Sequence, residues 1–116
     1  MKIDKFEDII AWQKSGTLTL NLYNQFKNCK DFSFRDQIYR AVISIMNNIA
    51  EGFERNTDKE LRYFLYIAKG SCAEVRSMLY VAFKLNYITN QEFKSNYALT
   101  VEISKLIFGF IKTLNF

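Results

Sequence analysis

Apolar residues recur at helical spacing along most of the chain. The clearest run follows Thr57, where apolar positions alternate at intervals of four and three residues. This spacing places them on one face of an α-helix, as expected for a seam that packs into a bundle. Similar faces occur before and after this run. The three predicted core faces are Leu61, Leu65, Ala68, Cys72, Val75, Leu79 and Ala82; then Ile38, Val42, Ile45, Ile49 and Phe53; and finally Phe93, Thr100, Ile103, Ile107, Phe110, Ile111 and Leu114.

Capping patterns predict where these helices begin. Thr57 and Thr89 are each followed three residues later by glutamate, which is the capping-box arrangement. Ser33 with Asp36 is a weaker version, and a further helix is expected from near Ile10 to near residue 28. The connections between these segments are short, so successive helices should be antiparallel neighbours. The sequence predicts an all-α protein with an antiparallel up-down-up-down four-helix bundle.

The composition agrees with one helical domain spanning residues 1–116. The chain contains no proline and only 4 glycines, which disfavours turn-rich β architectures and disorder. Apolar residues make up 49% of the chain and aromatic residues 16%, more than a lone bundle of this length needs. We therefore expect part of the apolar surface to face another copy of the chain.

No segment resembles a targeting or membrane-spanning sequence. The first residues alternate charged and apolar positions, and no window approaches the roughly 18 uninterrupted apolar residues of a spanning helix. We expect a soluble cytoplasmic protein with no membrane partner. Cys29 and Cys72 lack the paired spacing of metal ligands, and Cys72 falls on an apolar helix face.

The sequence offers little catalytic chemistry. It contains no histidine, which excludes histidine-assisted nucleophiles and histidine metal sites. Its glycines are isolated, so no phosphate-binding loop is predicted. Paired carboxylates such as Glu51 with Glu54, or Asp58 with Glu60, lie at helix ends, where capping and solvated roles are more common. We therefore predict no catalytic residue, no metal site and no cofactor, and we expect a protein that is not an enzyme.

A polar stripe runs along the second predicted helix. At 100° per residue its six members share one face: Gln37, Arg40, Ser44, Asn48, Glu51 and Arg55. Composition alone favours a solvated outer face, stabilised by pairs such as Glu51 with Arg55. The alternative is a hydrogen-bonded network at a helix or subunit interface, in which Arg40 pairs with Glu74 of the next helix.

The net charge of +4 is unevenly distributed. Residues 1–60 hold nine basic and nine acidic side chains, whereas residues 61–116 hold seven basic and three acidic ones. Six of the basic residues form two stripes, flanked on the first by Tyr66 and Tyr80. Basic residues interleaved with aromatics suit phosphate neutralisation and base stacking. For a single copy with this charge a solvated face is favoured, and oligomerisation shifts the balance because each copy repeats the stripe. The stripes are Arg62, Lys69 and Arg76, and Lys94, Lys105 and Lys112.

Several segments together resemble the bacterial four-helix-bundle family encoded in intervening sequences of 23S ribosomal RNA genes. They are residues 6–15 (FEDIIAWQKS), 36–41 (DQIYRA), 44–45 (SI), 48–52 (NIAEG) and 70–74 (GSCAE). Met46 departs from the family, which typically carries proline after Ser-Ile. The resemblance implies a homo-oligomer, typically a pentamer, with no assigned catalytic activity. The accessory variability protein of diversity-generating retroelements is a distant relative that engages nucleic acid and a reverse transcriptase.

The resemblance changes the interpretation of the polar stripe. Its residues, together with Gly52 and Glu74, coincide with the family's motif positions, which favours a structural network over a solvated face. The leading hypothesis is a non-enzymatic homo-oligomer that binds nucleic acid, with RNA favoured over DNA, through the two basic stripes. A scaffold that binds only protein partners is the competing class. An enzyme that uses Glu51 or Glu74 is the third.

Overall fold

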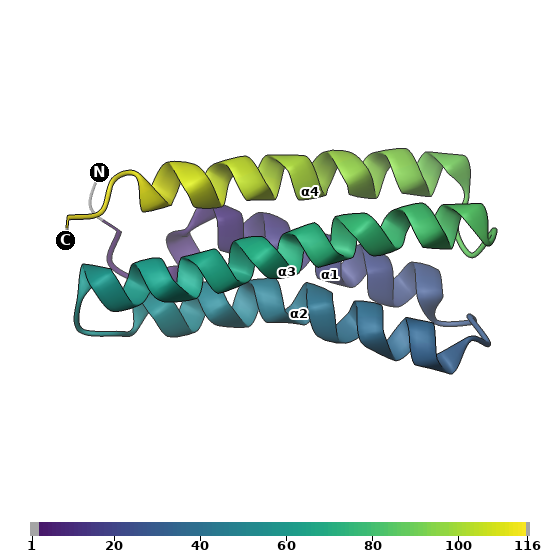
Figure 1. Cartoon of the computed structure of the whole chain (residues 1–116), viewed down its shortest axis with the longest axis horizontal. Coiled ribbons are helices and arrows are strands. Elements are labelled where there is room, and N and C mark those ends of the chain that lie inside the picture. The colour runs from purple at the N-terminus through teal and green to yellow at the C-terminus, as the bar shows by residue number, and fades with distance from the viewer. Residues whose placement is uncertain (1–2, 116) are drawn as a thin grey trace.

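Four long helices form an all-α bundle within residues 3–115, which are the residues that the computed structural model describes. A short 3₁₀ turn, η1 (Phe6–Asp8), precedes α1 (Ile10–Phe26), α2 (Phe32–Phe53), α3 (Asp58–Lys84) and α4 (Asn90–Ile111). Figure 1 shows successive helices running in opposite directions along a bundle that measures 44 × 22 × 19 Å. Both ends of the chain lie at the end of the bundle that carries the α2–α3 turn (Figure 1).

The caps explain where the helices begin. Thr89 and Glu92 form the complete capping box at α4, with each side chain bonded to the other residue's backbone N–H. At α3 the Thr57 hydroxyl accepts from the backbone N–H of Glu60, and the Glu60 carboxylate bonds this hydroxyl as well. The predicted start of α2 at Ser33 is wrong by two residues. Asp31 is the N-cap, because its carboxylate accepts from the backbone N–H of Phe34 at 3.2 Å.

The core lies where the apolar spacing predicts it. All seven predicted positions of α3 are buried, and so are all those of α2 except Phe53, which is half-buried. On α4, four of the predicted positions are buried, whereas Phe93 and Phe110 lie at the edge of the core. Leu114 packs against the core from beyond the end of α4. The α2 helix continues through Met46, whose sulfur meets the Thr19 hydroxyl at 3.5 Å.

Gly52 permits a close approach between α2 and α3. A Cβ at this buried position would lie 2.7 Å from the Cβ of Phe64 and 3.3 Å from the carbonyl oxygen of Leu61. The absence of a side chain therefore lets the last turn of α2 press against the first turns of α3. This gives the glycine of the NIAEG segment a packing role.

The opposite end of the bundle is closed by the α1–α2 and α3–α4 turns. Asn86 adopts φ 61°, a left-handed conformation that asparagine tolerates better than most residues, and it ends α3 sharply. Within the part of the chain that the structure describes, no helix is long and apolar enough to cross a membrane.

Candidate nucleic-acid interface

The basic stripe of α3 lies on the side of that helix that faces α4. Lys69 is half-buried, with its ammonium group 5.8 Å from the ring centre of Phe108 on α4. Arg76 is also half-buried, one turn before Tyr80, whose ring packs edge-on against Tyr97 of α4. The stripe therefore follows the junction between the two helices instead of the outer surface of α3.

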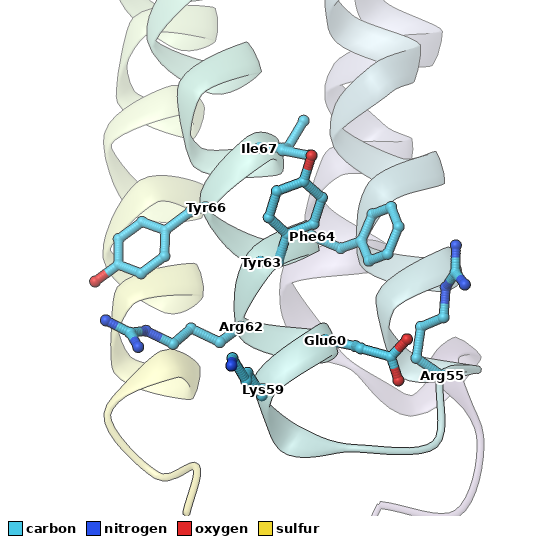
Figure 2. Close-up of a pocket in the computed structure, with 8 residues that line it drawn as sticks. All are labelled: Arg55, Lys59, Glu60, Arg62, Tyr63, Phe64, Tyr66 and Ile67. Atoms are coloured by element: carbon cyan, nitrogen blue, oxygen red, sulfur yellow. The ribbon is translucent and has the colours of Figure 1, made fainter. Parts of the chain in front are cut away.

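Arg62 begins this stripe near the α2–α3 turn. It is exposed, and its guanidinium lies 5.7 Å from the ring centre of Tyr66. Figure 2 shows both side chains reaching toward α4, whereas Phe64 points the other way, toward Arg55 beside the end of α2. Basic and aromatic groups therefore lie on both sides of the first turns of α3, with Arg55 contributed by the α2–α3 turn.

The basic residues of α4 divide into a pair and a single residue. Lys105 lies in the last two turns of α4 and Lys112 is its C-cap residue, with its ammonium group 5.2 Å from the Phe108 ring centre. Lys69, Ser104, Lys105 and Phe108 line a hollow of about 250 Å³, which we call the Phe108 hollow. Lys94 is exposed near the start of α4, about 27 Å along the helix from Lys112 at 1.5 Å per residue. The structure therefore joins the two predicted stripes at Phe108 and leaves Lys94 apart.

Three acidic side chains near the two stripes are engaged elsewhere, whereas Glu74, on the same helix as Arg76, is exposed. On α4, Glu92 belongs to the cap and Glu102 pairs with Lys14 of α1 at 3.6 Å. On α3, Asp58 accepts from the backbone N–H of Asn115 at 2.9 Å. Within residues 3–115 no ion pair involves five of the six basic residues of the stripes, which are Lys69, Arg76, Lys94, Lys105 and Lys112. Within the described part of one copy, these five side chains thus carry positive charge without a direct acidic partner.

The Arg76 guanidinium acts on two neighbouring groups at the α3–α4 junction. Burial raises the pKa of the Cys72 thiol to about 11, and the charges of Arg76 and Lys69 partly oppose this rise. The pKa of Tyr80 is raised, chiefly by its hydrogen bond to Tyr97, and Arg76 again opposes the change. Cys72 is fully buried, with its sulfur 3.2 Å from the carbonyl oxygen of Thr100. It is a core residue, as its helix position predicts.

A larger open hollow of about 810 Å³ lies on the outer surface of α3, beside the α2–α3 turn. We call it the Tyr63 hollow, and Figure 2 shows its eight lining residues. Its basic members are Arg55, Lys59 and Arg62, with Glu60 as the acidic one. The Arg55 guanidinium lies 4.8 Å from the ring centre of Phe64. Through Arg62 this hollow borders the basic stripe of α3.

The middle of the polar stripe joins α2 to α3. The hydroxyl groups of Ser44 and Ser71 are 3.0 Å apart, and the Asn48 amide donates to both the hydroxyl and the carbonyl oxygen of Ser44 at 2.9 and 2.8 Å. Both Ser44 and Asn48 are half-buried. Hydrogen bonds of this kind stabilise a helix pair when every buried group finds a partner.

The ends of the polar stripe face solvent. Glu51 pairs with Arg55 at 3.4 Å, one helical turn apart, and Gln37 and Arg40 are exposed. The Ser44–Ser71 contact brings Arg40 and Glu74 to nearly the same level of the antiparallel helices. No ion pair joins them within residues 3–115, and Glu74 is exposed.

Phe108 and Lys59, which line the two hollows, are among the residues that were not predicted from sequence. Phe108 lies three residues after Lys105 and four before Lys112, a spacing that places all three on one helix face and could have identified it. Lys59 lies three residues before Arg62 and could have been found in the same way. Within the described residues, no three histidine, cysteine, aspartate or glutamate side chains gather to hold a metal ion.

Comparison with known proteins places this fold in a family. The family model described as 23S rRNA-intervening sequence protein matches residues 7–109. A crystal structure from Bacteroides thetaiotaomicron VPI-5482, described as a protein with unknown function from the S23 ribosomal protein family, superposes with a TM-score of 0.82 at 26% sequence identity. The match covers 88% of this chain and 98% of that one. No curated protein matches the chain. The chain belongs to the 23S rRNA-intervening sequence protein family.

Proposed function

We propose that this protein is a non-enzymatic, homo-oligomeric module that binds nucleic acid through the junction between α3 and α4. The observation that carries the proposal is the set of five basic side chains that have no ion pair within residues 3–115, two of which border the exposed ring of Phe108. Lysine and arginine side chains bind nucleic acid by neutralising phosphates, and aromatic rings add stacking with bases. The family's description refers to 23S rRNA, so RNA is the first nucleic acid to test.

In this proposal, self-association strengthens the binding of nucleic acid. Each copy repeats the same basic stripe, so an assembly sums the positive field and engages several phosphates at once. Because one copy has a mass of 13.7 kDa, light scattering of the purified protein should give a multiple of this mass.

The experiment is a salt titration of RNA binding. A structured RNA is titrated with wild-type protein, and with a variant that carries Arg62→Glu, Lys69→Glu and Arg76→Glu, at several salt concentrations. The control variant carries Lys27→Glu, Lys30→Glu and Lys84→Glu, which make the same change in charge near the opposite end of the bundle. Each phosphate contact adds about 0.7 to 0.9 to the magnitude of the slope of log K against log salt, so removing three contacts should reduce this magnitude by about 2 to 3.

Two results count against the proposal. One is an affinity for RNA that does not fall steeply as salt rises. The other is equal weakening of RNA binding by the stripe variant and by the control variant, because this would show that only the net charge matters.

A second candidate function is a scaffold built from copies of this chain, with no role in nucleic-acid binding. The outer face of α3 exposes Tyr63 and Ile67 beside the basic groups of the Tyr63 hollow. A second copy offers complementary groups, because Ile10 is exposed next to the acidic residues Glu7 and Asp8. In this alternative, Tyr63→Asp together with Ile67→Asp yields a 13.7 kDa species in light scattering, and the stripe variant leaves the assembly intact.

A further inference from the structure

Phe108 is an exposed ring held among lysines that come from two helices. Its side chain is 41% exposed, and the ammonium groups of Lys69 and Lys112 lie 5.8 and 5.2 Å from the ring centre. Lys105 lines the same hollow from one turn earlier on α4. No acidic residue lines the Phe108 hollow.

The ring of Phe108 is not part of the hydrophobic core. Ile107 and Ile111 provide the buried face of the last turns of α4, and Phe108 lies outside the core and the side chains packed against it. Single exposed apolar residues are common in proteins and require no special explanation. The lysines on both sides of the ring make this position unusual, because they combine a flat apolar surface with concentrated positive charge.

The lysines leave room for another group on the ring. Cation–π attraction is effective to about 6 Å from the ring centre, so both ammonium groups lie near the outer limit of this range. At exposed sites such contacts contribute weakly, and a stacked group could displace either ammonium toward a phosphate. The hollow has a volume of about 250 Å³, which is below the roughly 300–1,000 Å³ of pockets that hold drug-sized ligands. It suits one small planar group.

We infer that the Phe108 hollow binds one unpaired base of a single-stranded nucleic acid, with the phosphates on either side of this base held by Lys69 and Lys112. The inference rests on the proposed nucleic-acid binding and names the form of nucleic acid that the site takes. A base in a duplex is stacked between its neighbours and offers no open face to a ring on a helix surface. An unpaired base can stack on an aromatic side chain, and this contact is largely independent of sequence.

The test separates stacking from charge. Phe108→Leu keeps an apolar side chain and all the lysines but removes the aromatic face. An unstructured 12-nucleotide RNA and the same strand in a duplex are titrated with wild-type and variant protein. Because one base–aromatic stack contributes about 1–3 kcal/mol, single-strand affinity should fall between about 5- and 150-fold. Duplex affinity should change less than about twofold, and the salt slope should stay the same because the phosphate contacts remain.

Two further variants sharpen this test. Phe108→Trp retains an aromatic face and should restore single-strand affinity. Phe32→Leu is the matched control, since Phe32 is 59% exposed with the guanidinium of Arg35 4.8 Å from its ring centre but lies at the start of α2. This control should bind both RNAs as wild type does.

The possible failures can be told apart. If wild-type protein binds neither RNA at low salt, the proposed function fails and this inference fails with it. If wild-type protein binds both RNAs and Phe108→Leu has no effect, or weakens both equally, nucleic-acid binding stands and the stacking site is overturned.

Discussion

The phenol of Tyr87 donates a 2.7 Å hydrogen bond to Oδ2 of Asp31, 56 residues away in the sequence. Asp31 is also the N-cap of α2, so one carboxylate starts that helix and ties the α1–α2 turn to the α3–α4 turn. The hydrogen bond to Tyr87, and then that from Phe34, lowers the pKa of Asp31. The same bond raises the pKa of Tyr87.

These pKa shifts predict that the difference in stability between wild-type protein and Tyr87→Phe depends on pH. Because the pKa of Asp31 is lowered in the fold, its ionised carboxylate stabilises the protein at pH above the ordinary pKa of 3.8. This contribution is lost as the pH falls through the pKa of Asp31 in the folded protein. Because the pKa of Tyr87 is raised in the fold, its neutral phenol stabilises the protein at pH below the ordinary pKa of 10.0. This contribution is lost as the pH rises through the pKa of Tyr87 in the folded protein. Urea midpoints should therefore differ most at neutral pH and converge in acid.

Tyr39→Phe is the control for this series. The Tyr39 hydroxyl donates to the carbonyl oxygen of Tyr23 at 3.1 Å, and this acceptor does not titrate. The difference in urea midpoint between Tyr39→Phe and wild type should be constant from neutral pH into acid. A difference for Tyr87→Phe that is equally constant would contradict the assigned role of Asp31.

Gly52→Ala should destabilise the protein. Its Cβ would lie 2.7 Å from the Cβ of Phe64, an atom fixed to the backbone, so α2 and α3 must move apart. Overpacking of this kind typically costs about 1–3 kcal/mol. Gly70→Ala has no neighbour within 4 Å of the new Cβ and should stabilise α3 by about 0.5–1 kcal/mol. Urea unfolding followed by circular dichroism measures both changes.

Lys69 and Lys112 should act together in binding single-stranded RNA, because both lie beside the ring of Phe108. A double-mutant cycle of Lys69→Glu and Lys112→Glu should give a coupling energy of about 0.5–3 kcal/mol, the range for residues that share a partner. The cycle of Lys69→Glu with Lys94→Glu should be additive to within about 0.5 kcal/mol, because Lys94 lies far along α4. Equal coupling in both cycles would show that the lysines act only through the overall field.

The two cysteines should differ in their reaction with iodoacetamide. Cys72 is fully buried and its thiol pKa is raised to about 11, so it holds little of the reactive thiolate near neutral pH. Cys29 is partly exposed. Mass spectrometry of native protein should show one modification, at Cys29, and both cysteines should react in denaturing guanidinium. Rapid modification of Cys72 in the native protein would indicate that the α3–α4 junction opens.

Features that depend on local sequence could be predicted well. The capping box at Thr89 and the buried seam of α3 follow from residues within one helix, and the structure confirms both. The start of α2 was misplaced because Ser33 and Asp31 are both good N-caps, and the choice of Asp31 also depends on Tyr87 from a distant turn. The sequence could not reveal this long-range hydrogen bond.

The candidate site was harder to predict because it depends on how helices pair. Single-helix geometry identified the basic stripes but could not show that Lys69 of α3 and Lys112 of α4 meet at one ring. In the same way, the polar stripe was assigned to one face of α2, yet only the contact between Ser44 and Ser71 shows which of its members join α3. The pairing of Arg40 with Glu74 stays a prediction for the assembled protein.

The position of both chain ends has a practical consequence for binding measurements. Figure 1 places them at the end of the bundle that carries the last turns of α4, and the backbone N–H of Asn115 bonds Asp58 at the start of α3. An affinity tag or surface tether on either terminus would therefore be attached at the end of the bundle that also holds the Phe108 hollow. A label attached at the exposed Leu85, before the sharp turn at Asn86, lies at the far end of a 44 Å bundle and leaves that surface open to solution.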